Sequence, residues 1–136
     1  MTGERIYKGT AGIGDAVEGE ALVAHDNFSA RYDLDRIEGV FSRPGHKLFG
    51  ESYVGKILIL NIAKGGVATA WMLREMTDRN MGPVALILNA ANPIMAQGAA
   101  FANLPLIDRF DVDITSVITT GERVAVDPSC ATVKVV

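Results

Sequence analysis

The segment Lys64-Gly65-Gly66 places a cation and two glycines directly before a predicted helix. Backbone N–H groups at the start of a helix have no partners within the helix, so they attract carboxylates and phosphates. The N–H groups of Gly65, Gly66 and Val67 could form an anion pocket, and Lys64 would add charge to it. Alternatively, the two glycines only permit a tight turn between a strand and a helix. Both interpretations are open at this point.

The residues around this loop do not match a nucleotide-binding motif. Neither Gly-x-x-x-x-Gly-Lys-Ser/Thr nor Gly-x-Gly-x-x-Gly occurs there. Thr69 carries the only hydroxyl group in the first turn of the predicted helix. It could contact a ligand or hydrogen-bond back to the helix backbone.

The histidines and the cysteine do not suggest a catalytic set. His25 and His46 are the only histidines, and neither has a second ligand at metal-binding spacing. His46 lies in a Pro-Gly loop, so we expect it on the surface. Cys130 is the single cysteine and is expected to be buried or in a turn. One thiol excludes an internal disulfide and a cysteine-rich metal site built by this chain alone.

An acidic segment, residues 29–39, is expected to be a solvated face. It contains Asp33, Asp35 and Glu38 but lacks the glycine and terminal glutamate of a calcium loop. We therefore expect no metal ligands in this chain.

Composition limits the partners. The net charge is −3 and no basic stripe occurs, so nucleic acid is not expected. No apolar run approaches the roughly 20 residues that span a bilayer. The N-terminus has no apolar signal region, and with a single cysteine this favours a cytoplasmic protein. Hydrophobic residues make up 49% of the 136 residues, which fits either a well-filled core or a surface buried against a partner.

The elements that must position the loop form a βαβ unit. Residues 57–60 are a short apolar run typical of a covered strand. The helix is predicted over residues 67–79, and Asn-Met-Gly-Pro ends it. Residues 84–88 are a second buried strand, so the two strands should be parallel.

One face of this helix is predicted to point into the core. Val67 and Trp71 are four residues apart, and so are Ala68, Met72 and Met76. Side chains at this spacing share a face. We therefore expect Trp71 and Met76 to point inward.

The flanking segments predict further strands, so the chain should form one α+β domain with a β/β/α arrangement. Predicted strands are residues 5–8, 18–24, 104–107, 123–126 and 132–136, the last two as a hairpin. Residues 93–102 predict a short helix, 9–14 a glycine-rich connection, and 114–119 fit neither pattern clearly.

An ordered series of motifs is similar to the small subunit, or swivel domain, of the aconitase X family. The motifs are Gly19-Glu20-Ala21-Leu22-Val23, Leu48-Phe49-Gly50-Glu51-Ser52, Gly55-Lys56-Ile57-Leu58, Lys64-Gly65, Pro83-Val84-Ala85-Leu86-Ile87, Gly98-Ala99 with Leu104-Pro105, and Thr120-Gly121-Glu122-Arg123-Val124. Each motif is weak alone, but together they extend over nearly the whole chain.

This resemblance implies a single swivelling β/β/α domain over residues 1–136. It also implies a heterodimer with a large subunit that carries an iron or iron–sulfur centre, while this chain binds no cofactor. Members are hydro-lyases that dehydrate small hydroxy acids, as in cis-3-hydroxy-L-proline dehydratase and phosphomevalonate dehydratase. The metal assists departure of the hydroxyl group, and a base on the small subunit takes the proton α to the carboxylate.

The chain departs from the family pattern in the glycine loop. The family usually has Lys-Gly-Ser-Ser/Thr, whose first serine is the expected proton acceptor, whereas this chain has Gly66 followed by Val67. The resemblance therefore implies substrate binding by Lys64, Gly65, Gly66 and Val67. Thr69 is the nearest hydroxyl group and the candidate catalytic residue. The base could be relocated, it could come from the large subunit, or the chain could be a non-catalytic regulatory or anion-binding module.

Overall fold

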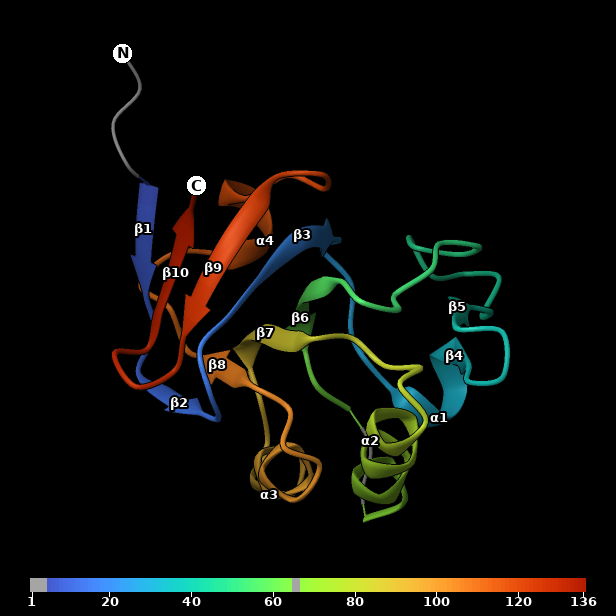
Figure 1. Cartoon of the computed structure of the whole chain (residues 1–136). Coiled ribbons are helices and arrows are strands. Elements are labelled where there is room, and N and C mark those ends of the chain that lie inside the picture. Colours follow the sequence, from blue (N-terminus) through green and yellow to red (C-terminus); the bar gives the residue numbers. More distant parts are fainter. Residues whose placement is uncertain (1–4, 65–66) are drawn as a thin grey trace.

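The chain folds around one curved, mixed sheet (Figure 1). The computed structural model describes residues 5–64 and 67–136. The strands of the sheet are β1 (Arg5–Lys8), β2 (Ala11–Ile13), β3 (Val17–Val23), β6 (Ile57–Ile62), β7 (Ala85–Ala90), β8 (Leu106–Asp108), β9 (Arg123–Asp127) and β10 (Thr132–Val135). A two-stranded sheet contains β4 (Leu34–Asp35) and β5 (Val40–Phe41), and the helices are α1 (Ala30–Asp33), α2 (Val67–Asp78), α3 (Pro93–Phe101) and α4 (Ile114–Val117).

The strand order shows that the large sheet is rolled. The order is β1-β10-β9-β3-β6-β7-β8-β2, with β1 and β2 at opposite edges although only two residues separate them. The edges must therefore approach each other at Gly9 and Thr10. The N–H of Gly9 donates to the carbonyl of Ala131 at 2.7 Å, and that of Thr10 to Asp108 at 3.0 Å. The expected 9–14 connection is thus partly wrong, because β2 lies within it.

The predicted βαβ unit is confirmed. β6 and β7 pair in parallel, with Ile57 opposite Ala85 and Leu60 opposite Leu88, and α2 connects them. All four residues of the 57–60 run are fully buried. A continuous apolar run forms here because both faces of the strand are covered.

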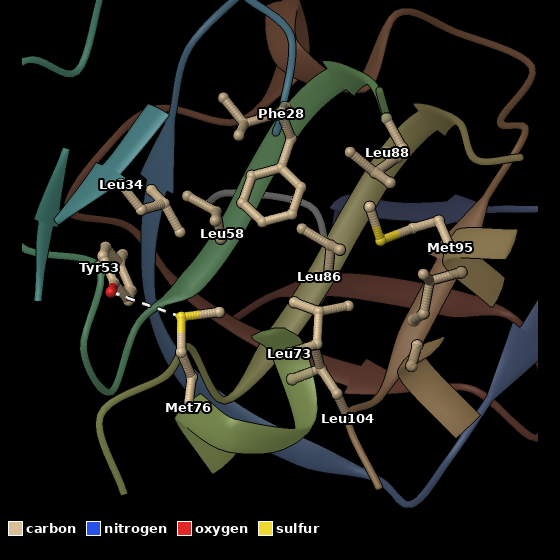
Figure 2. Close-up of a cluster of buried hydrophobic side chains, with 14 of the residues drawn as sticks. Phe28, Leu34, Tyr53, Leu58, Leu73, Met76, Leu86, Leu88, Met95 and Leu104 are labelled. Carbon is tan, nitrogen blue, oxygen red and sulfur yellow. Dashed lines mark hydrogen bonds between the residues drawn. The ribbon is translucent and has the colours of Figure 1, made fainter. Parts of the chain in front are cut away.

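Two hydrophobic cores lie on opposite faces of the sheet. Figure 2 shows the first, where Leu58 and Leu86 from the sheet pack with Leu73 and Met76 from α2. Within this cluster the hydroxyl of Tyr53 donates to the sulfur of Met76 at 3.5 Å. The second core fills the inside of the rolled sheet and contains Ile57, Ile59, Ile87, Ile114, Val124, Val126 and Val133.

The inward face of α2 was only partly predicted. Met76 is 1% exposed, which confirms one expectation, and Leu73 beside it is also 1% exposed. Trp71 was expected inside but is 61% exposed. Two residues before Leu73, Trp71 lies roughly 200° around the helix from it, so both cannot face the sheet.

The ends of the chain behave largely as predicted. β9 and β10 form the expected antiparallel hairpin, with Val126 opposite Val133. The ambiguous 114–119 segment begins as α4, because the Asp113 side chain caps it by accepting from the N–H of Thr115. Among the described residues, no helix is long and apolar enough to cross a membrane.

Candidate active site

The Lys64 loop begins at the carboxyl edge of the parallel strands β3, β6, β7 and β8, which is where ligands bind in sheets of this kind. The chain after β3 runs beside the end of β6. Phe28 donates its N–H to the carbonyl of Ile62 at 3.0 Å, and Lys64 donates its N–H to the carbonyl of Phe28 at 2.8 Å. These bonds fix Lys64 against the segment that leads into α1.

Two residues of the predicted site, Gly65 and Gly66, lie outside the described residues. Val67 and Thr69 lie in the first turn of α2, but their side chains are not described. Their roles in substrate binding and catalysis therefore stay predictions. Lys64 is described and is exposed.

A cavity of about 490 Å³ opens beside Lys64. Apart from Lys64, its lining comes from the segment before α1, from α1, and from the loop after β5. These residues are Asp26, Asn27, Ser29, Tyr32, Asp33 and Arg43.

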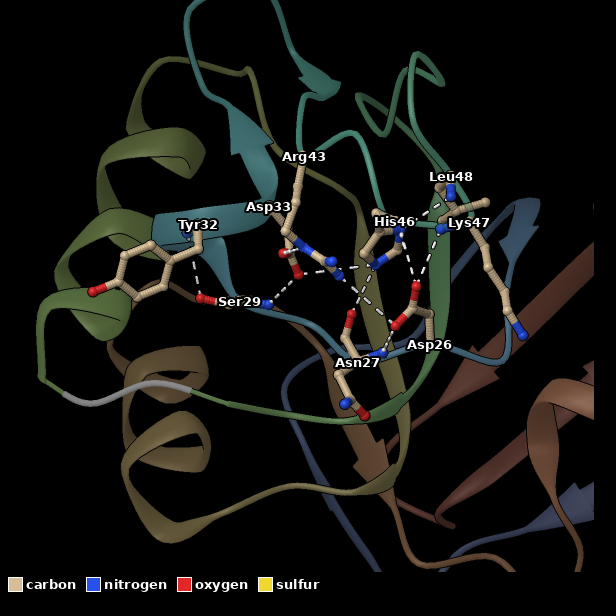
Figure 3. Close-up of polar contacts among 9 residues, drawn as sticks. All are labelled: Asp26, Asn27, Ser29, Tyr32, Asp33, Arg43, His46, Lys47 and Leu48. Carbon is tan, nitrogen blue, oxygen red and sulfur yellow. Dashed lines mark hydrogen bonds and ion pairs between the residues drawn. The ribbon is translucent and has the colours of Figure 1, made fainter.

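Two of the lining residues, Asp33 and Arg43, form an ion pair (Figure 3). Arg43 donates from Nε to Oδ1 of Asp33 at 2.5 Å, and its Nη2 lies 3.8 Å from Oδ1 of Asp26. The expected solvated position of Asp33 is wrong, since the residue is 4% exposed. Its second oxygen accepts the N–H of Ser29 at 2.9 Å, so the carboxylate holds the start of α1 as well as Arg43.

His46 is also buried rather than on the surface, with 3% exposure. Its ring stacks on Phe41 at a centroid distance of 4.6 Å. Nδ1 accepts the N–H of Leu48 at 3.0 Å, so the proton of the neutral ring is on Nε2, which donates to the carbonyl of Asn27 at 2.8 Å. Both ring nitrogens are occupied, and His46 therefore has a structural role.

Asp26 stays ionised beside this histidine. Burial acts to raise its pKa, but the N–H groups of Asn27 and Lys47 donate to the carboxylate and lower the pKa below its usual value. The charge of Arg43 acts in the same direction. The cavity wall next to Lys64 thus carries fixed negative as well as positive charge.

A second polar cluster lies at the same edge of the sheet, next to α4. Asn89, on β7, donates from Nδ2 to Oδ1 of Asn61 at 2.9 Å and to Oδ1 of Asp113 at 2.7 Å. His25, which follows β3, has Nδ1 3.2 Å from Oδ2 of Asp113 and 2.9 Å from the hydroxyl of Thr115. The hydroxyl of Thr115, with Asn89, holds the pKa of Asp113 far below its usual value.

The comparisons identify the family. Residues 6–135 match the profile described as aconitase X swivel domain. The chain belongs to the aconitase X swivel domain family. It is 36% identical over 110 residues to the phosphomevalonate dehydratase small subunit of Methanococcoides burtonii, covering 81% of this chain and 80% of that protein. It is also 36% identical over 114 residues to the protein of that name from Methanothrix thermoacetophila, covering 84% and 82%.

The fold of a solved family member agrees. The crystal structure of Thermococcus kodakaraensis aconitase X in its holo form superposes with a TM-score of 0.89 at 29% identity. The match covers 97% of this chain and 98% of that one. The expected α+β swivel-type fold is therefore confirmed.

In this swivel domain the two clusters were not predicted as groups. Asp26, Asp33 and Arg43 are separated in sequence and have no motif that links them. The only usable signal for the second cluster is that Asn61 and Asn89 are each next to last in an apolar strand, which places two amides at one edge of the sheet. His25 and Asp113 are 88 residues apart, so only the fold joins them.

The swivel domain presents the exposed ammonium group of Lys64 at this edge. Within residues 5–64 and 67–136, no ion pair to Lys64 is found, whereas Arg43 is paired with Asp33. Over the same residues, no group of three or more His, Cys, Asp or Glu side chains could hold a metal ion. The arrangement is suited to bind an anion at Lys64.

Proposed function

We propose that this chain is the small subunit of a heteromeric dehydratase that removes water from a small hydroxy acid. The observation that carries the proposal is a family match over nearly the whole chain, with the Lys64 cavity at the carboxyl edge of the parallel strands. Relatives named as phosphomevalonate dehydratase small subunits are covered over 80% or more of their length in the two cases above. For the substrate we propose only the class, a small hydroxy acid.

Lys64 and the following loop would hold the carboxylate of the substrate. The ammonium group of Lys64 is exposed, and an anion within about 4 Å of it gains roughly 1 to 4 kcal/mol, depending on how much water is excluded. The N–H groups of Gly65, Gly66 and Val67 would add donors if the loop has the predicted form. Backbone binding of this kind does not require the serine that Gly66 replaces.

We assign the metal to the partner. An iron or iron–sulfur centre on a large subunit would act as a Lewis acid on the departing hydroxyl group. The described part of this chain has no metal-ligand cluster, and its one cysteine, Cys130, is exposed and unpaired. A free thiol also fits the reducing cytoplasm, where we place the protein.

The partner would cover the edge of the sheet at which the loop lies. Hydrophobic side chains on β6, α2 and α3 are exposed: Ile62 by 43%, Trp71 by 61% and Phe101 by 48%. The rings of Trp71 and Phe101 meet edge to face at 5.3 Å, and the guanidinium of Arg74 lies 4.4 Å from the centre of the Phe101 ring. Trp, Arg and other large side chains of this kind carry much of the binding energy of interfaces.

A non-catalytic module is the second candidate. Gly66 and Val67 cannot accept a proton through their side chains, which favours a regulatory swivel domain that retains only the anion site. The two candidates predict the same fold and the same exposed loop. They differ in whether the assembled complex dehydrates a hydroxy acid.

The deciding experiment is reconstitution. This chain is co-expressed with a large aconitase X subunit, and the purified complex is supplied with hydroxy acids while the unsaturated product is followed by NMR. Turnover that falls about tenfold or more in Lys64→Met supports the dehydratase. A stable complex without turnover, in which Gly66→Ser creates it, supports the non-catalytic module. Failure to form any complex contradicts both.

Thr69 is tested in the same complex. If its hydroxyl accepts the proton, Thr69→Ala should lower kcat about 100-fold or more, whereas Thr69→Ser should retain activity. Unchanged turnover in Thr69→Ala removes this residue as the base without affecting the proposal for the complex.

A further inference from the structure

The hydrogen bonds around His25 determine which ring nitrogen carries the proton. The hydroxyl of Thr115 has one hydrogen, and it donates this to Oδ1 of Asp113 at 2.6 Å. Its oxygen must therefore act as acceptor toward Nδ1 of His25 at 2.9 Å. Oδ2 of Asp113, at 3.2 Å from the same nitrogen, is also an acceptor. The neutral ring thus has its proton on Nδ1 and a free lone pair on Nε2.

The two histidines of the chain differ in whether a ring nitrogen is available to accept a proton. Both nitrogens of His46 are used by backbone groups in the interior. The side chain of His25 is 58% exposed, and no described residue hydrogen-bonds to its Nε2. Of the two imidazoles, only that of His25 can take a proton from a bound molecule.

The carboxylate behind His25 is held rigidly. Asp113 accepts from Asn89 at 2.7 Å, from the N–H of Thr115 at 3.0 Å and from the hydroxyl of Ser116 at 3.0 Å. Asn89 in turn donates to Asn61, so the network connects α4 with the ends of β6 and β7. Such a carboxylate fixes the orientation of the ring and stabilises the imidazolium that forms when Nε2 is protonated.

The position of His25 places it next to the proposed site. His25 directly precedes Asp26, which lines the Lys64 cavity, and the carbonyl of Asp26 accepts the N–H of Asn61 at 2.8 Å. His25 and Lys64 therefore follow neighbouring parallel strands, β3 and β6, at one edge of the sheet. His25 does not itself line the cavity, so a ligand bound at Lys64 would have to extend along this edge to reach it.

We infer that His25, oriented by Asp113, is the proton acceptor in the proposed dehydration, an inference that rests on the proposed function. The substrate C–H bond breaks, its electron pair forms the C=C bond, and the proton passes to Nε2. The C–O bond breaks with its pair on oxygen, the departing hydroxide takes one proton from solvent to become water, and Nε2 releases its proton to solvent so that the ring is neutral again. His25 is the catalytic residue, and Asp113 is a positioning residue.

The test uses the complex of this chain with its large subunit. His25→Gln should lower kcat by about 10² to 10⁴-fold with KM changed less than about threefold, because proton transfer and not binding is lost. Added imidazole should restore part of the activity in His25→Gly. Asp113→Asn should lower kcat at least about tenfold, since the amide can turn its N–H₂ toward Nδ1 and favour the wrong tautomer.

Asp127→Asn is the matched control. Asp127 accepts from the N–H and hydroxyl of Ser129 at 3.1 and 2.6 Å, the pattern that Asp113 has with Thr115, but has no imidazole beside it. Its replacement should leave kcat and KM within about twofold. A drop as large as that of Asp113→Asn would show that the loss reflects turn structure, and would overturn the inference.

A second readout does not depend on turnover. ¹⁵N NMR of the full chain should show His25 protonated on Nδ1, and Asp113→Asn should shift it toward Nε2. Protonation on Nε2 in the wild type overturns the inference, as does full activity of His25→Gln in a working complex. In either case the proposed dehydratase stands, whereas an assembled complex that dehydrates nothing overturns both.

Discussion

The ion pair between the buried Asp33 and the partly exposed Arg43 is the clearest residue-scale determinant of the site. Asp33→Asn should lower the free energy of unfolding by about 1–3 kcal/mol, because a nearly buried carboxylate loses its charge-assisted bond to Arg43. Arg43 is 39% exposed at its side chain and can be rehydrated, so the cost stays below that of a fully buried pair. Urea unfolding of the isolated chain measures the difference.

Glu18→Gln provides the control for that prediction. Glu18 also pairs closely with an arginine, Arg123, but the two side chains are 47% and 61% exposed. A solvated pair contributes about 0–1 kcal/mol, so this variant should unfold within about 0.5 kcal/mol of the wild type. Equal losses in the two variants would contradict the structural role given to Asp33.

The lowered pKa of Asp113 predicts that the stability of the fold depends on pH. The hydroxyl of Thr115 and the amide of Asn89 lower its pKa in the folded chain, so the unfolded chain binds the proton more readily. Its contribution to stability is therefore complete above about pH 4 and is lost as the pH falls below that value. Asp113→Asn should destabilise the chain near pH 6, and the difference from wild type should shrink toward about pH 2.5. A difference that is constant with pH in urea unfolding would contradict this.

Single residues were predictable from the sequence only where local pattern decides their environment. The exposed Lys64 follows from its place after a buried strand, and Met76 from helical spacing. His46 and Asp33 were predicted wrongly because each lies in a polar segment, and their burial depends on Phe41 and Arg43. Contacts between distant segments of this kind leave no periodic signal.

At the scale of elements, α2 allows a test of whether the burial or the size of a side chain determines how much its removal destabilises the fold. Leu73 is 1% exposed, so Leu73→Ala should cost about 2–5 kcal/mol through lost burial and a cavity. Trp71→Ala removes a larger side chain, but one that is 61% exposed, and should cost less than about 1.5 kcal/mol, mainly the edge-to-face contact with Phe101. Urea unfolding of the two variants tests this, and a larger loss for Trp71→Ala would show that the inward face of α2 is misassigned.

The closure of the rolled sheet depends on a glycine in β2. A Cβ atom at Gly12 would lie 2.3 Å from the carbonyl oxygen and 2.8 Å from the Cα of Pro128, at the turn between β9 and β10. Gly12→Ala must push these backbones apart, and we expect a loss of about 1–3 kcal/mol. Gly45→Ala is the control, since its Cβ would meet only the end of the Arg43 side chain at 3.3 Å. Thermal unfolding should separate the two, and equal melting temperatures would contradict the close approach.

The two strands of the βαβ unit were predictable because each is a short apolar run, and its helix because hydrophobic residues recur at helical spacing. β2 was not, since it has three residues and pairs with β8 about 95 positions later. The roll of the sheet also could not be predicted from local sequence. The roll follows because β1 and β2, which are neighbours in sequence, lie at opposite edges of the sheet. Only the complete strand order shows this.

At the scale of the whole molecule, the two cores leave α2 and α3 with hydrophobic side chains outside. Both helices cover one face of the sheet, as Figure 1 shows, and their inner sides fill the first core. Trp71 and Phe101 lie on the outer side of these helices and are exposed by 61% and 48%. Of the two explanations for the 49% hydrophobic content, the structure shows the filled core, and a surface buried against a partner stays a prediction.

Trp71 provides a direct test of the proposed assembly, because it is the only tryptophan in the chain. Labelled with 5-fluorotryptophan, the small subunit should give one ¹⁹F resonance, whose position differs between H₂O and D₂O because the ring is exposed. If the large subunit covers this face, adding it unlabelled should shift the resonance and reduce the solvent-isotope difference, since the ring leaves water. Size-exclusion chromatography shows independently that a complex has formed. A complex in which the resonance and its isotope difference are unchanged would place the interface away from α2, and the partner could then not cover the Lys64 loop from this side.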